Sequence, residues 1–499
     1  MTRMETIPTG QAGDSTSSVS VPGPRTAPGD GWLARLRPAG AATIGGEPPR
    51  RLLLVSLGLA CLAITLVFLG VARGPQMSIT DEPVHAGYLY SIAHGEIPFK
   101  GQLTPKEIRY EWYCHNLQAS TGSAVCTGFD ASTFQTTSQV YTFGDPPVYY
   151  IITGLLDRAI SPLIPGSHNF ITVGRDLGAL WLFAAMIVLY LAARKFRVRT
   201  PYAFAAAALL PLCPGVLAST TQITSDTPAA LCGAIGLYVL ARILIDKRTG
   251  VVIPFLATVF TAGTKVLNGM PLLVVGGVTF FIAIATVYRD RRDWRSAVRP
   301  LLITAVIALG FAITFLGWTV FQNHRGDPHW VNPNAANGVP LTGSSTGDLM
   351  SNLFGTFTKL TTAYWLPASI NGESVSIWAT LLCVVLVSAP LMVMTASRAR
   401  SWGWTLGVGT FIGITAISLA VEAQVFMANN EYFVDVAPRY ALTFLPWAIL
   451  CLAVVAGRRR LLKSSYAFVS LGLIVLLLAE TGLLTLGPAL VSNAKYLVG

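Results

Sequence analysis

Two adjacent carboxylates, Asp81 and Glu82, follow a strongly apolar segment in the stretch SITDEPVHAGYLYSIAHGEIP, residues 78–98. Paired acids can remove a proton from a hydroxyl group, orient a substrate or bind a divalent cation. An isolated pair more often caps a helix and complements its dipole, an effect of about 0.3–1 kcal/mol. Here His85 lies one helical turn after the pair, and similar charges recur elsewhere, so we favour a chemical role.

Four further ionisable residues stand at the ends of other apolar segments, on the face identified below as outer: Arg175, Asp226, Lys265 and Arg439. A charge in the bilayer core costs about 2.5–3.5 kcal/mol on insertion scales, so such residues are candidate functional residues. For Arg175 and Arg439 taken singly, a side chain that extends to the interface is an equally good explanation. Lys265 is harder to explain in that way, because Gly, Asn, Gly and Pro interrupt the apolar run around it.

The elements that must position these residues are membrane spans. The 499-residue chain is 53% hydrophobic and 12% charged, and its apolar residues gather in segments of about 20, the length that crosses a bilayer. We predict an all-α polytopic membrane protein of about eleven transmembrane helices. The spans are expected near residues 52–72, 171–193, 201–218, 226–245, 251–263, 267–287, 300–321, 375–396, 404–421, 440–456 and 467–486.

The basic residues define the orientation. Most of the 35 Lys and Arg residues fall in the N-terminal segment and in every second loop, as the positive-inside rule requires of cytoplasmic segments. The N-terminus is therefore expected in the cytoplasm and the C-terminus outside. The net charge of +11 then reflects topology and does not indicate a nucleic-acid partner. The basic inner loops are Arg194–Arg199, Arg242–Arg248, Arg289–Arg299, Arg398–Arg400 and Arg458–Lys463.

Residues 1–50 are rich in Gly, Pro, Ser and Thr, and we expect them to form a disordered cytoplasmic tail before a membrane domain at 51–499. No cleavable leader is expected, so the first span should remain an anchor. Long outer loops are expected at about 73–170, 322–374 and 422–439. Because the inner loops are short, any chemistry should face outward.

The first outer loop should carry interfacial helices. Thr80 or Asp81 can cap a helix of about a dozen residues that ends near Gly95, and a second should start at the Pro146-Pro147 pair. One side of the first helix is apolar at helical spacing, so we expect it to lie along the membrane surface with both acids directed toward the spans. That side holds Val84, Tyr88, Leu89 and Ile92.

Two cysteines, Cys114 and Cys126, lie in this first outer loop, whereas the other five lie in predicted spans. An extracytoplasmic compartment permits disulfides. We therefore predict a disulfide between Cys114 and Cys126, and two unpaired thiols are the alternative.

The order of these features resembles the C-type superfamily (GT-C) of membrane glycosyltransferases, which take a sugar from a polyprenyl-phosphate donor on the outer face. Six segments are similar to a bacterial membrane family called domain of unknown function 2142: TDEPVHAGYLYSIAHGEIP, DPPVYYIITGLL, GRDLGAL, LASTTQITSDTPAAL, TAGTKVLNGMPLL and PRYALTFLP. The resemblance covers about residues 50–460. One departure is Val266, where proline often follows the lysine.

The resemblance implies roles for the candidate residues. Asp81 would be the general base, and Glu82 would orient the acceptor or help to hold a divalent cation, Mg or Mn. Asp226 would be a second acid, for the acceptor or the metal. The phosphate of the donor would be bound by four basic side chains: Lys265, Arg439, Arg175 and His85.

The implied reaction transfers a sugar, with inversion, from a polyprenyl-phosphate donor to a glycan or lipid acceptor of the cell envelope, with membrane lipid as the third partner. Arginine outnumbers lysine and Ala, Gly and Leu are abundant, which points to a GC-rich bacterium, and we expect the protein in its plasma membrane. Two alternatives stay open. One is a secondary transporter of a lipid or small solute, in which Lys265 and Asp226 are pathway charges, and the other is an inactive scaffold for envelope assembly.

Overall fold

Most of the membrane domain is described by the computed structural model. The described residues are 47–74, 77, 81–114, 134, 138–164, 170–247, 250–289, 294–330, 339–340, 347, 369–370, 373–374, 377–399, 401–429, 431–432 and 436–459. Everything below concerns residues 44–499, which make up one compact unit. The expected tail thus lies almost wholly outside the described residues.

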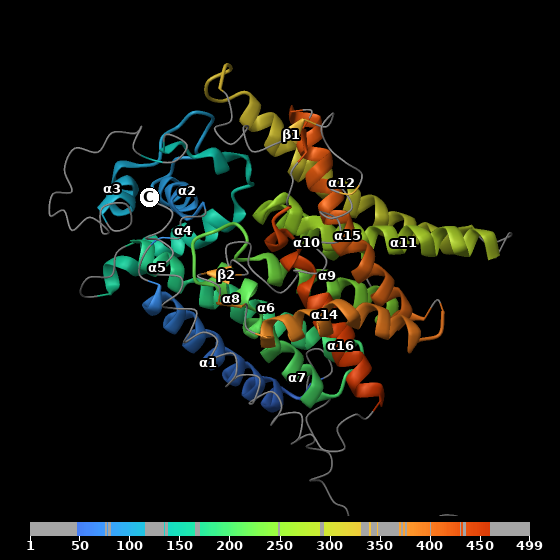
Figure 1. Cartoon of the computed structure of the whole chain (residues 1–499). Coiled ribbons are helices and arrows are strands. Elements are labelled where there is room, and N and C mark those ends of the chain that lie inside the picture. The colour runs from blue at the N-terminus through green and yellow to red at the C-terminus, as the bar shows by residue number, and fades with distance from the viewer. Residues whose placement is uncertain are drawn as a thin grey trace, which may run out of the picture. The chain divides into compact units, whose positions relative to one another are not determined.

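The chain is built from apolar helices (Figure 1). Seven helical stretches in the described part are long and apolar enough to cross a membrane. The long helices are α1 (Pro49–Arg73), α6 (Gly178–Lys195), α9 (Ala229–Ala241), α10 (Val252–Thr264), α11 (Met270–Arg289), α12 (Arg295–Asn323), α14 (Ile377–Thr395), α15 (Trp402–Asn429) and α16 (Leu445–Arg459). The protein is therefore an all-α polytopic membrane protein, as predicted.

Nine of the eleven predicted spans coincide with these helices, and another, 467–486, lies outside the described residues. The predicted span 201–218 is not one straight helix. It consists of α7 (Thr200–Leu209), a 3-10 turn and α8 (Pro214–Thr220), with a bend of 66°. Pro211 and Pro214 explain the break, because proline lacks the amide hydrogen that a continuous helix needs.

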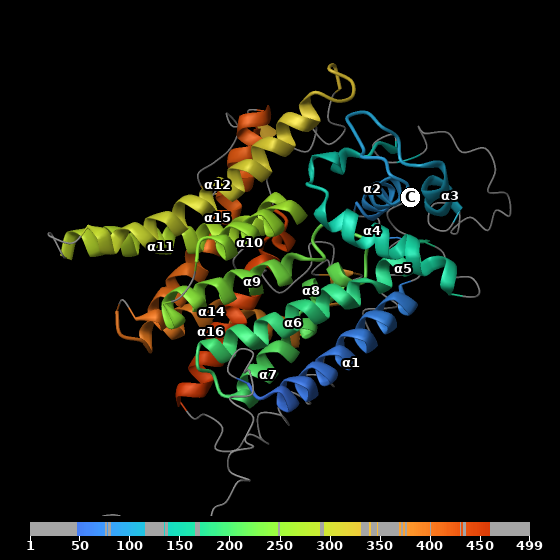
Figure 2. The same ribbon diagram turned by 180° about the vertical axis from the view of Figure 1, so that it is seen from behind.

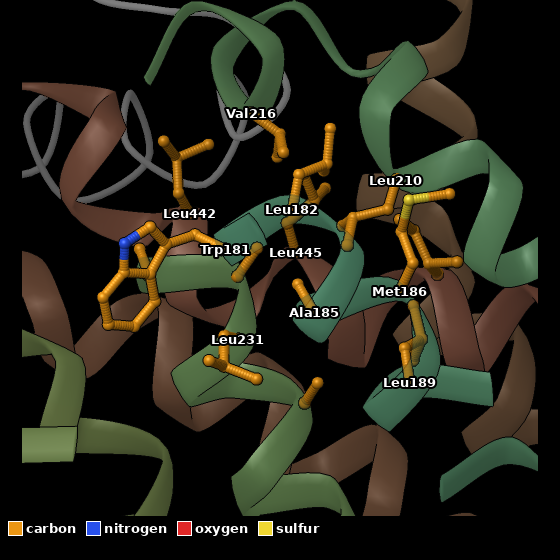
Figure 3. Close-up of a cluster of buried hydrophobic side chains, with 14 of the residues drawn as sticks. Trp181, Leu182, Ala185, Met186, Leu189, Leu210, Val216, Leu231, Leu442 and Leu445 are labelled. Carbon is orange, nitrogen blue, oxygen red and sulfur yellow. The ribbon is translucent and has the colours of Figure 1, made fainter. Parts of the chain in front are cut away.

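At the centre of the bundle, α6 packs against α9, α8 and α16 (Figure 3). Lipid tails are as apolar as these side chains, so close van der Waals contact, rather than exclusion of water, holds the helices together. The residues that meet there are Trp181, Leu182, Ala185, Met186 and Leu189 of α6 with Leu210, Val216, Leu231, Leu442 and Leu445, all of which are buried. Figure 2 shows α11 and α12 on the opposite side from α1.

Three helices of the first outer loop lie together beyond one end of α1: α2 (Glu82–Ala93), α3 (Lys106–Trp112) and α4 (Val148–Ile160) (Figure 1). Helix α2 starts and ends where predicted, and α4 follows the Pro146-Pro147 pair. The expectation of a surface helix with one apolar face is wrong for α2: every residue except Tyr90 is buried, because α3 and α4 cover it. Instead, α4 leaves Ile151 and Leu155 exposed.

The other outer loops are described only in part. Helix α12 continues to Asn323, and the following turn pairs with the first outer loop, between Gly326 and Lys100. Two short strands, β1 (Val339–Pro340) and β4 (Glu431–Tyr432), pair antiparallel and so join the second and third outer loops. Strands β2 (Ser369–Ile370) and β3 (Glu373–Ser374) form a second antiparallel pair. The three loops predicted to be outer are thus linked to one another in the described residues.

Candidate active site

Asp81 sits at the N-terminus of α2, but its side chain does not cap the helix. The Tyr141 hydroxyl donates to Oδ1 of Asp81, and Nη2 of Arg439 donates to Oδ2 at 2.6 Å. The backbone of Asp81 has φ 61°, in the left-handed region, which costs a non-glycine residue about 1–3 kcal/mol. That backbone directs the carboxylate away from the helix and toward Arg439.

Asp226 joins the same group of charges. Nζ of Lys265 donates to its Oδ1 at 2.5 Å, and Nε of Arg439 lies 3.5 Å from its Oδ2. The ring of Tyr440 faces both cations, 4.8 Å from Nζ of Lys265 and 5.6 Å from the guanidinium carbon of Arg439. Four residues far apart in the sequence therefore form one chain of alternating charge, Asp81–Arg439–Asp226–Lys265, which we call the charge cluster.

The break in the apolar run around Lys265 places its side chain. Helix α10 ends at Thr264, Lys265 is extended with φ −167° and ψ 139°, and a 3-10 turn, η9 (Val266–Gly269), leads into α11. Nδ2 of Asn268 donates to the carbonyl oxygen of Ser225 at 3.3 Å and to the Thr264 hydroxyl at 3.1 Å. The amide thus ties the lysine segment to the residue before Asp226. Val266 at the start of η9 does not prevent the turn.

A close helix crossing sets the distance between Asp226 and Arg439. Arg439 lies on the 3-10 segment η12 (Pro438–Phe444), and Asp226 lies just before α9. A Cβ atom on Gly233 would stand only 1.9 Å from the carbonyl oxygen of Thr443, so only glycine allows this approach. Nε1 of Trp447 donates to the Gly233 carbonyl at 2.9 Å and fixes the crossing.

Glu82 and Arg175 form a separate, fully buried pair. Nε and Nη2 of Arg175 donate to the two carboxylate oxygens at 2.7 and 2.8 Å, and the Ile223 amide donates to Oε1 at 3.0 Å. Nη1 of Arg175 also donates to the Gly74 carbonyl at 2.9 Å. The pair ties α2, α5 (Phe170–Asp176), the end of α1 and the segment before Asp226 to one another. In this arrangement both residues position the neighbours of the charge cluster.

His85 is buried beside the charge cluster, and its Nδ1 lies 2.6 Å from the Tyr150 hydroxyl. Burial lowers the pKa of His85 below its usual value, although Asp145, Asp81 and Asp226 act in the opposite direction. The role of His85 in binding the donor phosphate stays a prediction. Burial also opposes ionisation of Asp81, but Arg439, His85 and the Tyr141 hydrogen bond hold the pKa of Asp81 below its usual value.

Three residues at this site were not among the sequence candidates: Tyr141, Asp145 and Tyr440. Tyr440 follows a candidate arginine, and Asp145 lies in the quoted segment DPPVYYIITGLL. Nothing local marks Tyr141, because its contact with Asp81 spans 60 positions in the chain. Only the folded loop brings these side chains to the charge cluster.

The carboxylates expected to bind a divalent cation are held by the protein's own cations. Arg439 contacts Asp81, Lys265 contacts Asp226, and Arg175 contacts Glu82. No group of three or more His, Cys, Asp or Glu side chains in the described part of the chain is arranged to hold a metal ion. As they stand, these residues do not fit a metal site.

Cys114 is disulfide-bonded. Cys126, its predicted partner, lies outside the described residues, so the pairing stays a prediction. Four of the cysteines predicted to lie in spans are free thiols: Cys61, Cys213, Cys232 and Cys451.

Comparison with known proteins yields one solved structure of interest. The crystal structure of ArnT from Cupriavidus metallidurans bound to undecaprenyl phosphate matches 89% of this chain and 75% of its own, with 14% sequence identity and a TM-score of 0.42. No protein-family description matches the sequence. No curated protein matches it either.

Proposed function

We propose that this protein is an inverting glycosyltransferase of the bacterial plasma membrane, which transfers a sugar from a polyprenyl-phosphate donor to a cell-envelope glycan or lipid on the outer face. The observation that carries the proposal is the charge cluster. Two cations and two acids from four distant segments meet at one place, beside helices that are apolar enough to lie in lipid. Such a place suits a substrate with an anionic head and a lipid tail.

The two cations are assigned to the donor phosphate. In the reaction the bond between the anomeric carbon and the phosphate oxygen breaks, and its electron pair leaves with the phosphate. Lys265 and Arg439 stabilise that charge, because both present N–H donors to the same space. The acceptor oxygen attacks from the opposite face of the sugar, which inverts the anomeric carbon. Its proton passes to Asp81 and then to water.

Donor binding and base strength are coupled in this arrangement. Arg439 donates to Asp81 and lowers its pKa. A donor phosphate that binds the guanidinium group of Arg439 would weaken the hydrogen bond from Arg439 to Asp81. The pKa of Asp81 would then rise, so Asp81 would be a stronger base while the donor is bound. The base would thus be activated only when there is a sugar to transfer.

The test is reconstitution in liposomes with undecaprenyl phosphate carrying glucose, galactose, mannose or arabinose, and with extracted envelope glycan as acceptor. We expect transfer from at least one donor, and we expect Lys265→Gln to lower kcat/KM by about 100-fold or more, the effect of removing one charge-stabilising donor. Lys100→Gln is the matched control, because Lys100 bonds Asn323 in the same outer region. Equal activity of the two variants would refute the phosphate-binding role.

A divalent cation, Mg or Mn, remains part of the proposal only if it replaces a protein cation. It would have to displace Lys265 or Arg439 from Asp226 or Asp81. The same transfer assay with a chelator, and then with added Mg or Mn, tests this exchange.

A further inference from the structure

Asp145 differs from the other acids of the site because its carboxylate is not engaged. Asp81, Glu82 and Asp226 are each bound by an arginine or a lysine. The half-buried side chain of Asp145 makes no hydrogen bond or ion pair with any of the described residues. Nevertheless, among the charged groups around the His85 imidazole, Asp145 has the largest effect on its pKa. Among the charged groups around Lys265, Asp145 has the second-largest electrostatic effect, after Asp226. Asp145 therefore lies close enough to the charge cluster to act on it electrostatically.

An aromatic stack holds Asp145 in place. The Tyr88 hydroxyl donates to the backbone carbonyl of Asp145 at 3.0 Å, and the rings of Tyr88 and Tyr150 stack with centroids 3.8 Å apart and planes 12° apart. Burial raises the pKa of both tyrosines, so they remain neutral. Asp145 directly follows the turn η5 (Tyr141–Gly144), whose first residue binds Asp81. One turn therefore sets the separation of the two carboxylates.

His85 offers a second unengaged group on the same stack. Its Nδ1 is bound by Tyr150, whereas its Nε2 makes no hydrogen bond with the described residues. Only 5% of the residue is exposed, yet Nε2 is not one of the fully enclosed unpartnered atoms in the described residues, so a ligand can still reach it.

We propose that Asp145 and His85 form the acceptor-binding part of the site and that the acceptor presents a sugar with neighbouring hydroxyl groups. The inference rests on the proposed function, which it extends from a glycan or lipid in general to a carbohydrate acceptor. A carboxylate with two unengaged oxygens accepts from two adjacent hydroxyls, a pattern that a sugar ring supplies and a simple lipid alcohol does not. Nε2 of His85 then contacts a third polar group, while Asp81 receives the proton of the attacking hydroxyl.

Binding of methyl glycosides, measured by saturation-transfer NMR on the full-length protein, tests the inference without any catalysis. We use a panel of methyl pyranosides and furanosides and expect at least one to bind wild type. Asp145→Asn should weaken that binding at least tenfold, and His85→Phe should act in the same direction. Glu96→Gln, which changes an exposed carboxylate of the same loop, is the matched control. Thermal unfolding of each variant identifies loss of folding.

Kinetics then separate this inference from the proposed function. With octyl glycosides as acceptors, Asp145→Asn should raise the acceptor KM at least tenfold and lower transfer at least tenfold more than it lowers hydrolysis of the donor by water. Equal loss of hydrolysis and transfer would place Asp145 with the donor and overturn the inference. So would glycoside binding unaffected by Asp145→Asn, or no glycoside binding at all. Glycoside binding that depends on Asp145 in a protein without transfer or hydrolysis would refute only the proposed function.

Discussion

At the scale of single residues, the adjacent acids Asp81 and Glu82 have different partners. Asp81 stands outside the helix in a left-handed backbone conformation and reaches Tyr141 and Arg439, whereas Glu82 is the first helical residue and binds Arg175. A difference of one position thus separates a carboxylate at the charge cluster from one enclosed in a fully buried pair. The two acids should therefore respond differently to substitution.

Replacement of Asp81 should affect the reaction more than the fold. We expect Asp81→Asn to lower kcat by about 100- to 10,000-fold, the usual contribution of a general base, and to leave the melting temperature nearly unchanged, because the side chain is partly exposed. Transfer from the donor identified by reconstitution measures the first quantity. Undiminished transfer by this variant would remove Asp81 as the base.

Replacement of Glu82 should affect the fold more than the reaction. Glu82→Gln leaves the buried Arg175 charge without its counter-ion, a change that costs about 3–5 kcal/mol. The double variant Glu82→Gln/Arg175→Met should recover part of that loss. Thermal unfolding of both variants in detergent checks this, and an unchanged melting temperature in the single variant would contradict the assigned role.

A buried acid away from the charge cluster should make stability depend on pH. Burial raises the pKa of Asp157 in α4 to about 7, and within the described part of the chain the Ser161 hydroxyl donates to its carboxylate at 2.5 Å. Because an unfolded aspartate has a pKa of about 4, the folded protein keeps a proton that the unfolded chain releases. The stability that this proton contributes is therefore lost as the pH rises from about 4 through 7.

Asp157→Asn should remove that dependence. We expect the melting temperature of the variant to fall less than that of wild type between pH 5 and pH 8. Parallel melting curves of the two proteins over that range would show that Asp157 does not hold a proton.

At the scale of elements, two irregular segments carry the site. The extended break at Lys265 and the 3-10 segment η12 each interrupt an apolar run, and each presents a cation to Asp226. Irregular backbone at bilayer depth is tolerated where other parts of the protein satisfy its polar groups, as Asn268 does here. The two breaks therefore place the charged side chains of Lys265 and Arg439 beside Asp226, where side chains of continuous helices would not lie.

The close approach of α9 to η12 should be sensitive to a small change in side-chain volume. Gly233→Val should push the two segments apart, because any Cβ meets the Thr443 carbonyl, and so separate Asp226 from Arg439. Overpacking of this kind costs about 1–3 kcal/mol or more. Gly277→Val in α11 is the control, since nothing lies within 4 Å of its Cβ position. Thermal unfolding and transfer should fall in the first variant only.

At the scale of the whole molecule, the distribution of basic residues predicts which face carries the site. The polar residues of the charge cluster all follow or precede apolar helices at the ends predicted to be outer. A polyprenyl-phosphate donor would then be used outside the cytoplasm, where disulfides form. The bonded state of Cys114 is compatible with that compartment.

Labelling of cysteines in intact cells tests this topology. After mild reduction, a membrane-impermeant maleimide should label Cys114 and its predicted partner Cys126 from outside, and the Cys114→Ser/Cys126→Ser double variant should lose that label. Labelling of Cys114 only after the cells are opened would reverse the orientation and move the active site to the cytoplasmic face.

The sequence alone determined the helical membrane architecture and the types of residue at the site. Span length and the bias of basic loops are local properties, because a bilayer imposes one length on every span and one sign of charge on each side. For the same reason the sequence identified four charged candidates at the ends of apolar segments: Asp81, Asp226, Lys265 and Arg439.

Only the tertiary structure decided which of those charges meet. It placed Glu82 and Arg175 in a pair of their own, enclosed α2 on nearly all sides and brought Asp145 and Tyr141 to the site. Contacts between residues 60 or more positions apart depend on helix crossings such as that at Gly233, and on the bend at Pro211. Hydrophobic periodicity specifies the face of a helix and not its neighbour, so the partners of each charge follow from packing alone.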